Sequence, residues 1–165
     1  MSERHAKLSE PSGPPLISVV APSGTGKTTL MEGVIGRLNA AGHRVGAVKH
    51  DAHRIELDTE GKDSWRLRAA GAAGTVLMGR DQLAFFGTEE NTPDLQAVAA
   101  LLFADMDLVL VEGFRAAGLP SIVVTRPGHK DEAWEPPDPD RVLLTATSDE
   151  VDRVVAMLRD RYLTG

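Results

Sequence analysis

The chain has 165 residues, no cysteine and a formal net charge of −6, and 42% of its residues are hydrophobic. This length predicts one domain with a sizeable core. Without cysteines the chain has neither disulfides nor thiolate metal sites, which is typical of a cytoplasmic protein. The acidic balance argues against broad binding to nucleic acid or to acidic membranes. An anionic ligand therefore needs local basic groups such as Lys27, Lys49 and Lys62.

Residues 1–15 are polar, contain Gly and Pro, and have no apolar stretch. We therefore expect a flexible N-terminal tail rather than a secretory signal, followed by a single nucleotide-binding domain over residues 16–165. No apolar run in the chain approaches the length of a membrane span.

The strongest motif follows the first predicted strand, residues 17–20. It has the spacing of a phosphate-binding loop, with Ala21 in place of the usual first glycine. Glycines at positions 24 and 26 allow the backbone to aim several N–H groups at one phosphate. Lys27 can reach the β- and γ-phosphates, and the hydroxyl of Thr28 can bind Mg²⁺. We predict that a nucleoside triphosphate binds here rather than that the loop is a glycine-rich turn without a ligand. The predicted contacts are Pro22, Ser23, Gly24, Thr25, Gly26, Lys27, Thr28 and Thr29.

Strands and helices alternate along the remaining sequence. The predicted strands are 17–20, 44–49, 107–111, 122–124 and 142–144, and the predicted helices are 27–41, 63–70, 149–162 and one that begins at Pro93 with Thr92 as its cap. Residues 75–78 and 83–86 flank a polar turn and predict a β-hairpin. Residues 127–140 are rich in Pro and acidic side chains and predict a loop. This order indicates a mostly parallel sheet with helices on both faces and an inserted antiparallel hairpin.

Polar side chains follow several of the predicted strands and are expected to meet at one edge of the sheet. Glu112 ends an apolar strand, where a carboxylate can hold Mg²⁺ or polarise an attacking water, so we expect it beside Thr28. Asp51 can join the same metal or take part in catalysis. Lys49 can contact phosphate, and His50 and His53 either contact the ligand or simply line a cleft as polar loop residues.

A second polar segment lies between Asp58 and Ser64 around Gly61. It is either a mobile segment that responds to the γ-phosphate, with Lys62 and Asp63 as ligand contacts, or a plain turn that caps a helix. Arg126 follows a strand end and can reach an anion, although a surface arginine is the alternative. No Asn-Lys-x-Asp motif follows any strand, so the preferred base is not readable from the sequence. Residues 125–126 and 145–148 occupy places where base-contacting loops often lie.

Several segments together resemble one family. They are residues 21–30, Lys49-His50-Asp51-Ala52-His53, Asp58 with 61–64, 70–72 and 107–115. In this order they resemble MobB, the family of molybdopterin-guanine dinucleotide biosynthesis adapter proteins, over residues 16–126. The resemblance implies a P-loop NTPase-like fold that binds GTP and Mg²⁺, has weak GTPase activity and forms a homodimer.

The resemblance also implies site residues and partners. Gly24, Gly26, Lys27, Thr28 and Thr29 would hold the phosphates of GTP, and Thr28 with Glu112 would hold Mg²⁺. The implied partner is the guanylyltransferase MobA, with molybdopterin or its guanine dinucleotide as a further candidate ligand. We also expect the hairpin to be a dimer element, because an exposed strand pair offers an edge for sheet extension.

Two other functions fit the same loop. A small-molecule kinase would deliver the γ-phosphoryl group to an acceptor, but the single long loop, 127–140, has few basic residues for a closing lid. A GTP-dependent metallochaperone would deliver metal through cysteines or histidine tracts, and the chain has no cysteine and five scattered histidines. The sequence therefore favours a slow GTP-dependent adapter.

Overall fold

The computed structural model describes residues 13–51, 58–87, 93–114, 118–128 and 134–164. These residues fall into two compact units, one within Met1–Asp51 and Ala99–Gly165 and the other within Ala52–Val98. Most of the expected tail, residues 1–12, lies outside the described residues, and a single domain over residues 16–165 stays a prediction. None of the described helices is both long enough and apolar enough to cross a membrane.

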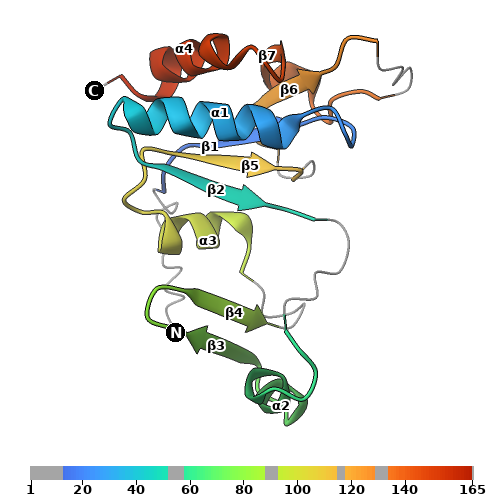
Figure 1. Cartoon of the computed structure of the whole chain (residues 1–165), viewed down its shortest axis with the longest axis vertical. Coiled ribbons are helices and arrows are strands. Elements are labelled where there is room, and N and C mark those ends of the chain that lie inside the picture. Colours follow the sequence, from blue (N-terminus) through green and yellow to red (C-terminus); the bar gives the residue numbers. More distant parts are fainter. Residues whose placement is uncertain (1–12, 52–57, 88–92, 115–117, 129–133, 165) are drawn as a thin grey trace, which may run out of the picture. The chain divides into compact units, whose positions relative to one another are not determined.

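The first unit is built on a five-stranded sheet in which every neighbouring pair is parallel (Figure 1). The strands lie in the order β2-β5-β1-β6-β7. Their bounds are β1 Leu16–Val20, β2 Val45–Lys49, β5 Leu108–Glu112, β6 Ser121–Thr125 and β7 Val142–Thr147. The apolar sequences of β1 and β5 are almost wholly buried, as in parallel sheets that are covered on both faces. Because all five strands run the same way, their carboxyl ends share one edge of the sheet.

Helices cover both faces of this sheet, which confirms the predicted fold class. Helices α1 (Lys27–Ala40) and α4 (Val151–Tyr162) pack on one face, where Leu38 and Leu158 are fully buried. On the other face Phe103 follows α3 (Leu95–Leu102) and lies against Gly46, where a Cβ atom would come within 2.9 Å of the phenylalanine ring. Side chains that point alternately to the two faces of the sheet therefore pack into an apolar layer on each face.

The second unit contains α2 (Asp63–Ala69) and the predicted hairpin, formed by β3 (Gly74–Met78) and β4 (Leu83–Gly87). The two strands are antiparallel and pair Val76 with Phe85 and Met78 with Leu83. The predicted hairpin is thus confirmed, with each strand one residue longer than expected.

Three predicted boundaries differ from the structure by two residues or more. The helix predicted to begin at Pro93 begins at Leu95, because the carboxylate of Asp94 accepts the backbone N–H of Ala97 at 2.7 Å and caps the first turn. Strand β7 continues to Thr147, since residues 145–147 pair with the end of β6. Helix α4 begins at Val151 rather than at residue 149, and Glu150 occupies its N-cap position. The predicted loop 127–140 contains the start of a 3₁₀ turn, Pro139–Arg141.

Candidate functional site

The glycine-rich loop, residues 21–26, connects the central strand β1 to helix α1. Gly24 has φ +78° and Gly26 has φ +96°, a left-handed conformation that favours glycine. The hydroxyl of Thr25 donates to the carbonyl oxygen of Pro22 at 2.9 Å and holds the loop in shape from inside. These contacts explain how the sequence forms a tight concave turn at this point.

Helix α1 begins at this loop without a capping side chain. Gly26 occupies the N-cap position, and the first turn contains no acidic residue. The first N–H groups of a helix have no partner within the helix and carry the positive end of its dipole. The loop and the helix start together therefore present donors and positive potential to an anion.

Lys27 folds back over the loop. Its ammonium group donates to the carbonyl oxygens of Pro22 at 2.8 Å and Ala21 at 3.1 Å. An arriving anion would compete for the same donors. The side chain of Lys27 therefore already lies over the loop in which it is predicted to contact phosphate.

Thr28 and Glu112 meet at the end of β5. The hydroxyl Oγ1 of Thr28 lies 3.2 Å and 3.3 Å from the two carboxylate oxygens of Glu112 and donates to that carboxylate. The pairing of β1 with β5, which sets Val19 opposite Glu112, brings the two side chains together. A hydroxyl and a carboxylate are oxygen ligands of the kind that Mg²⁺ prefers, so the donor set fits this metal.

The end of β2 lies beside the same carboxylate. Lys49 is opposite Glu112 in the β2–β5 register, and the backbone N–H of His50 donates to the carbonyl oxygen of Glu112 at 2.9 Å. The His50 ring packs against the ring of Phe114 at a tilt of 45°, with a centroid distance of 4.3 Å. Lys49, His50 and Asp51 are exposed at this edge. His53 lies outside the described residues.

Gly113 makes the close approach of these two strand ends possible. It has φ +82°, and a Cβ atom there would lie 2.8 Å from the carbonyl oxygen of His50. Any larger residue would push the β2 end away from Glu112. Glu112 therefore supplies the carboxylate, and Gly113 allows the end of β2 to lie beside it.

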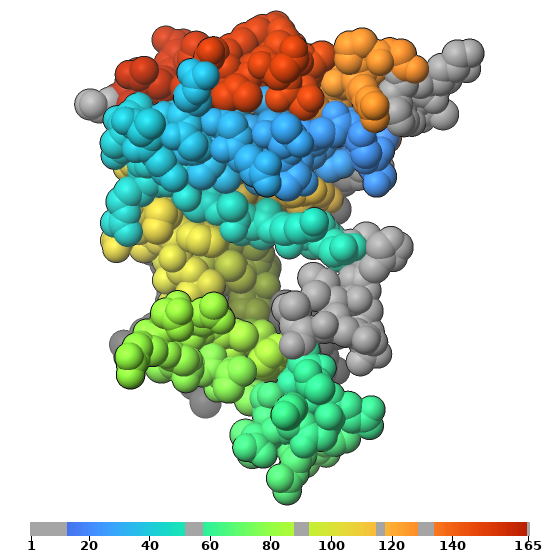
Figure 2. All heavy atoms as spheres, viewed as in Figure 1, coloured from blue at the N-terminus to red at the C-terminus, as the bar shows by residue number. Residues whose placement is uncertain are grey.

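The opposite side of the glycine-rich loop contacts the ends of β6 and β7. The guanidinium of Arg126 donates to the carbonyl oxygen of Gly24 at 3.4 Å, and the loop is exposed at the molecular surface in blue beside the orange end of β6 (Figure 2). The side chain of Ser148 lies close to Gly26. A Cβ atom added to Gly26 would be 2.7 Å from the Cβ atom of Ser148. The sequence placed residues 145–148 where base-contacting loops often lie, but it did not predict the contact of Ser148 with Gly26.

Lys62 and Asp63 belong to the second unit, and their contact with a ligand at the glycine-rich loop stays a prediction. There the carboxylate of Asp58, whose side chain is only 7% exposed, accepts hydrogen bonds from Ser64 at 2.8 Å and from Arg68 at 2.8 Å and 3.1 Å. The guanidinium of Arg68 also lies 5.5 Å from the centroid of the Phe86 ring. The segment that was predicted to be a mobile element or a turn is thus tied to α2 and the hairpin.

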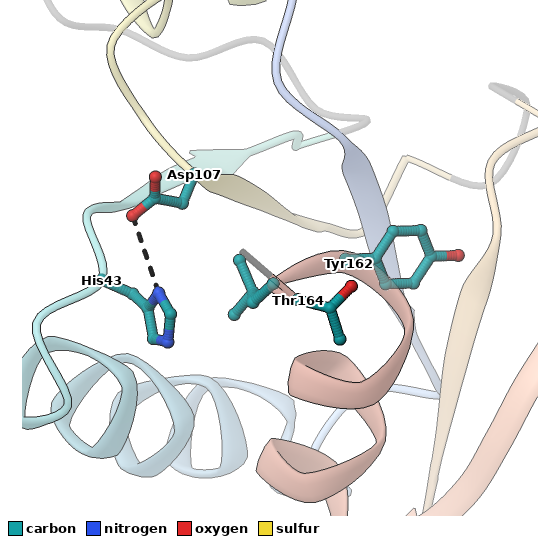
Figure 3. A pocket seen from close by; sticks show the side chains of 5 residues that line it. His43, Asp107, Tyr162 and Thr164 are labelled. Atoms are coloured by element: carbon teal, nitrogen blue, oxygen red, sulfur yellow. Dashed lines mark ion pairs between the residues drawn. The ribbon is translucent and has the colours of Figure 1, made fainter.

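The described residues also line a pocket of about 230 Å³ at the other edge of the sheet (Figure 3). Its wall includes His43 and Asp107, with 3.8 Å between the imidazole Nδ1 and the carboxylate Oδ2. The same oxygen accepts the backbone N–H of Arg44 at 2.8 Å. Because His43 precedes β2 and Asp107 precedes β5, this pocket lies at the opposite ends of the strands from the glycine-rich loop. Among the described residues, no three His, Cys, Asp or Glu side chains form a group that could hold a metal ion.

Comparison with known proteins connects this geometry to one family. The sequence model described as "Molybdopterin guanine dinucleotide synthesis protein B" matches residues 16–148. A molybdopterin-guanine dinucleotide biosynthesis adapter protein of Haemophilus influenzae is 35% identical over 146 residues, covering 86% of this chain and 80% of the relative. The protein of the same name from Escherichia coli is 42% identical over 123 residues, covering 72% of this chain and 70% of the relative.

Solved structures agree with the sequence comparison. A crystal structure of molybdopterin-guanine biosynthesis protein B is 29% identical, has a TM-score of 0.61, and covers 88% of this chain and 97% of its own. The structure of MobB from Bacillus subtilis is 28% identical with the same TM-score, covering 87% of this chain and 97% of its own. The chain therefore belongs to the MobB family.

Proposed function

We propose that this chain is a GTP-binding adapter of molybdopterin-guanine dinucleotide biosynthesis with slow GTPase activity. The observation that supports it most is the contact between the hydroxyl of Thr28 and the carboxylate of Glu112 beside a glycine-rich loop. That arrangement joins a phosphate-binding turn to a pair of Mg²⁺ ligands, one from the start of helix α1 and one from the end of strand β5. The names of the curated relatives, quoted above, support the adapter role.

In this proposal the loop residues divide the work of holding the triphosphate. The N–H groups of residues 23–26 and of the first turn of α1, including Thr28 and Thr29, bind the phosphate oxygens. Pro22, which has no N–H group, lines the loop. Lys27 exchanges the carbonyl oxygens of Ala21 and Pro22 for the β- and γ-phosphates. Thr28 and Glu112 hold Mg²⁺, which neutralises phosphate charge when it is bound.

The neighbouring polar residues have subsidiary roles. Glu112 and Asp51 orient the water that attacks the γ-phosphate, and Asp51 supports Mg²⁺ binding. Lys49, His50 and Arg126 add contacts to the nucleotide from the strand ends. Lys62 and Asp63, which lie in the second unit, and His53 are proposed as contacts on sequence grounds alone.

The partner in this proposal is the guanylyltransferase MobA, with molybdopterin or its guanine dinucleotide as a further ligand, and the protein acts as a homodimer in the cytoplasm. The hairpin supports the homodimer. One of its faces is apolar and exposed, with side chains that are 44–72% accessible: Val76, Met78, Leu83 and Phe85. The other face carries Phe86, which Arg68 covers. Exposed apolar strand pairs are common association surfaces.

Calorimetric titration of the full chain with GTP and ATP, with and without Mg²⁺, tests the binding claim. We expect GTP to bind more tightly than ATP and Mg²⁺ to strengthen that binding. Absence of triphosphate binding would contradict the proposal. Slow GTP hydrolysis that is independent of added acceptors distinguishes an adapter from a small-molecule kinase.

Light scattering on Val76→Lys/Met78→Lys tests the dimer claim. We expect this double variant to be a monomer, because two charges replace the centre of the apolar face. Leu101→Lys, which changes an equally exposed leucine on α3, is the matched control and should remain dimeric. A dimeric double variant would exclude the hairpin as the dimer element.

A further inference from the structure

The turn between β7 and α4, residues 148–150, lies beside the start of α1. Ser148 packs against Gly26, as its 2.7 Å approach to a Cβ atom built there shows. The order β2-β5-β1-β6-β7 puts this turn on one side of β1 and Glu112 on the other. A nucleotide whose Mg²⁺ and terminal phosphates lie at Thr28 and Glu112 would therefore extend its base toward the β6–β7 side.

The two carboxylates of this turn differ in what they can offer a ligand. Both oxygens of Glu150 are occupied by the protein, one by the backbone N–H of Thr147 at 2.8 Å and the other by the guanidinium of Arg153 at 3.0 Å. The carboxylate of Asp149 accepts the hydroxyl of Thr147 at 2.5 Å and is exposed. That hydrogen bond lowers the pKa of Asp149, so the side chain is an anionic acceptor at neutral pH.

An exposed carboxylate at this place discriminates between purines. Guanine presents two donors on one edge, N1–H and the 2-amino group, and the two oxygens of a carboxylate can accept both. Adenine has an acceptor at N1 and no 2-amino group, so it leaves the carboxylate unpaired. A site built to bind particular donors rejects an analogue that lacks them far more strongly than an apolar pocket can.

We propose that Asp149 selects guanine in the nucleotide site by accepting hydrogen bonds from N1–H and the 2-amino group of the base. This inference rests on the proposed function, because it takes the glycine-rich loop to hold a triphosphate. Thr147 is a positioning residue that orients the carboxylate. The arginine at position 126 offers only donors, which N7 and O6 of guanine can accept, so it cannot pair with the 2-amino group that distinguishes GTP from ITP and XTP.

Calorimetry of the full chain with Mg²⁺ and four triphosphates tests the proposal. The wild type should bind GTP more tightly than ITP, which lacks the 2-amino group, by about 10-fold or more, as expected for one hydrogen bond to a charged group. ATP should bind more weakly still. Asp149→Asn should weaken GTP binding by at least about 10-fold and strengthen XTP binding, since an amide pairs with N1–H and the 2-carbonyl of xanthine.

Asp160→Asn is the matched control, because it makes the same change at an exposed residue of α4 and should leave the order of nucleotides unchanged. Thermal unfolding checks that Asp149→Asn folds, and the comparison of GTP with ITP needs no variant. Equal binding of GTP, ITP and ATP by the wild type overturns this inference alone. So does unchanged preference for GTP over XTP in Asp149→Asn. Failure of the wild type to bind any triphosphate overturns the proposed function as well.

Discussion

The hydroxyl of Thr28 at the start of α1 lies 3.2 Å from a carboxylate oxygen of Glu112 at the end of β5, although 84 positions separate the two residues in the sequence. Thr28→Val keeps the shape of the side chain and removes this hydroxyl. We expect the affinity for GTP to fall about 10-fold or more in the presence of Mg²⁺ and to change little in its absence, because one metal ligand is lost. Calorimetry under both conditions measures the difference. Thr28→Ser, which retains the hydroxyl, should behave like the wild type, and an equal loss with and without Mg²⁺ would contradict the metal role.

Lys27→Ala removes the ammonium group that lies over the glycine-rich loop. Triphosphate affinity should fall by about 100-fold or more, because hydrogen bonds between charged groups in a binding site are lost together. The fold should persist, since the two hydrogen bonds that the charged Lys27 donates to Ala21 and Pro22 are worth about 1.5 kcal/mol each at this partly exposed position. Calorimetry and denaturant unfolding report the two quantities separately. Arg161→Ala, an equal change of charge at an exposed position of α4, should affect neither, and unchanged GTP affinity in Lys27→Ala would refute the assigned site.

Replacing the two glycines of the loop with alanine should lower the free energy of unfolding by different amounts. Gly24→Ala meets no atom within 4 Å and bears only the strain of its positive φ, about 1 kcal/mol. Gly26→Ala bears similar strain and in addition collides with Ser148. We therefore expect the free energy of unfolding to fall further for Gly26→Ala, as measured by denaturant titration. Adding Ser148→Gly should recover part of the loss in Gly26→Ala and none in Gly24→Ala, and equal losses in the two single variants would argue against the close contact.

Arg68→Leu removes the partner of the nearly buried Asp58 carboxylate. Leaving such a charge unpaired costs about 3 kcal/mol. Because the chain consists of two units, the loss should appear locally, as faster hydrogen exchange in α2 with little change in the strands of the parallel sheet. Asp58→Asn combined with Arg68→Leu removes the unpaired charge and should restore part of the protection. Uniform acceleration of exchange across both units would show that the pair also supports the first unit.

Much of the fold follows from local patterns in the sequence. Leu30, Val34 and Leu38 recur every four positions, a spacing that predicts a helix, and all three are buried in α1. Gly42, which follows the helix, has φ +91°, the left-handed conformation that commonly ends a helix. The boundary at Asp94 was missed because Pro93 also suits a helix start, and the capping hydrogen bond of the aspartate decided between them. The strand order could not be predicted, since it depends on pairings between distant segments.

The candidate site was predictable to the extent that its residues follow strand ends. That rule placed Glu112 near Thr28 and drew attention to Lys49 and His50. The contact of Ser148 with Gly26 was not predictable, because it depends on how β7 and α1 are arranged in space. The pairing of Asp58 with Ser64 and Arg68 had a detectable signal, since the latter two are four residues apart on one helix and face the same way.

The order of strands in the parallel sheet also determines when the protein can assemble during synthesis. The first two strands to emerge, β1 and β2, are not neighbours, and β5 lies between them. A nascent chain that ends before Leu108 therefore cannot form a single native pair of the five-stranded sheet, although the hairpin can close by itself. Pairing over such long separations is slow, because loop closure precedes the stabilising contacts. The glycine-rich loop is made early on the ribosome but gains its supporting neighbours only after about two thirds of the chain has been translated.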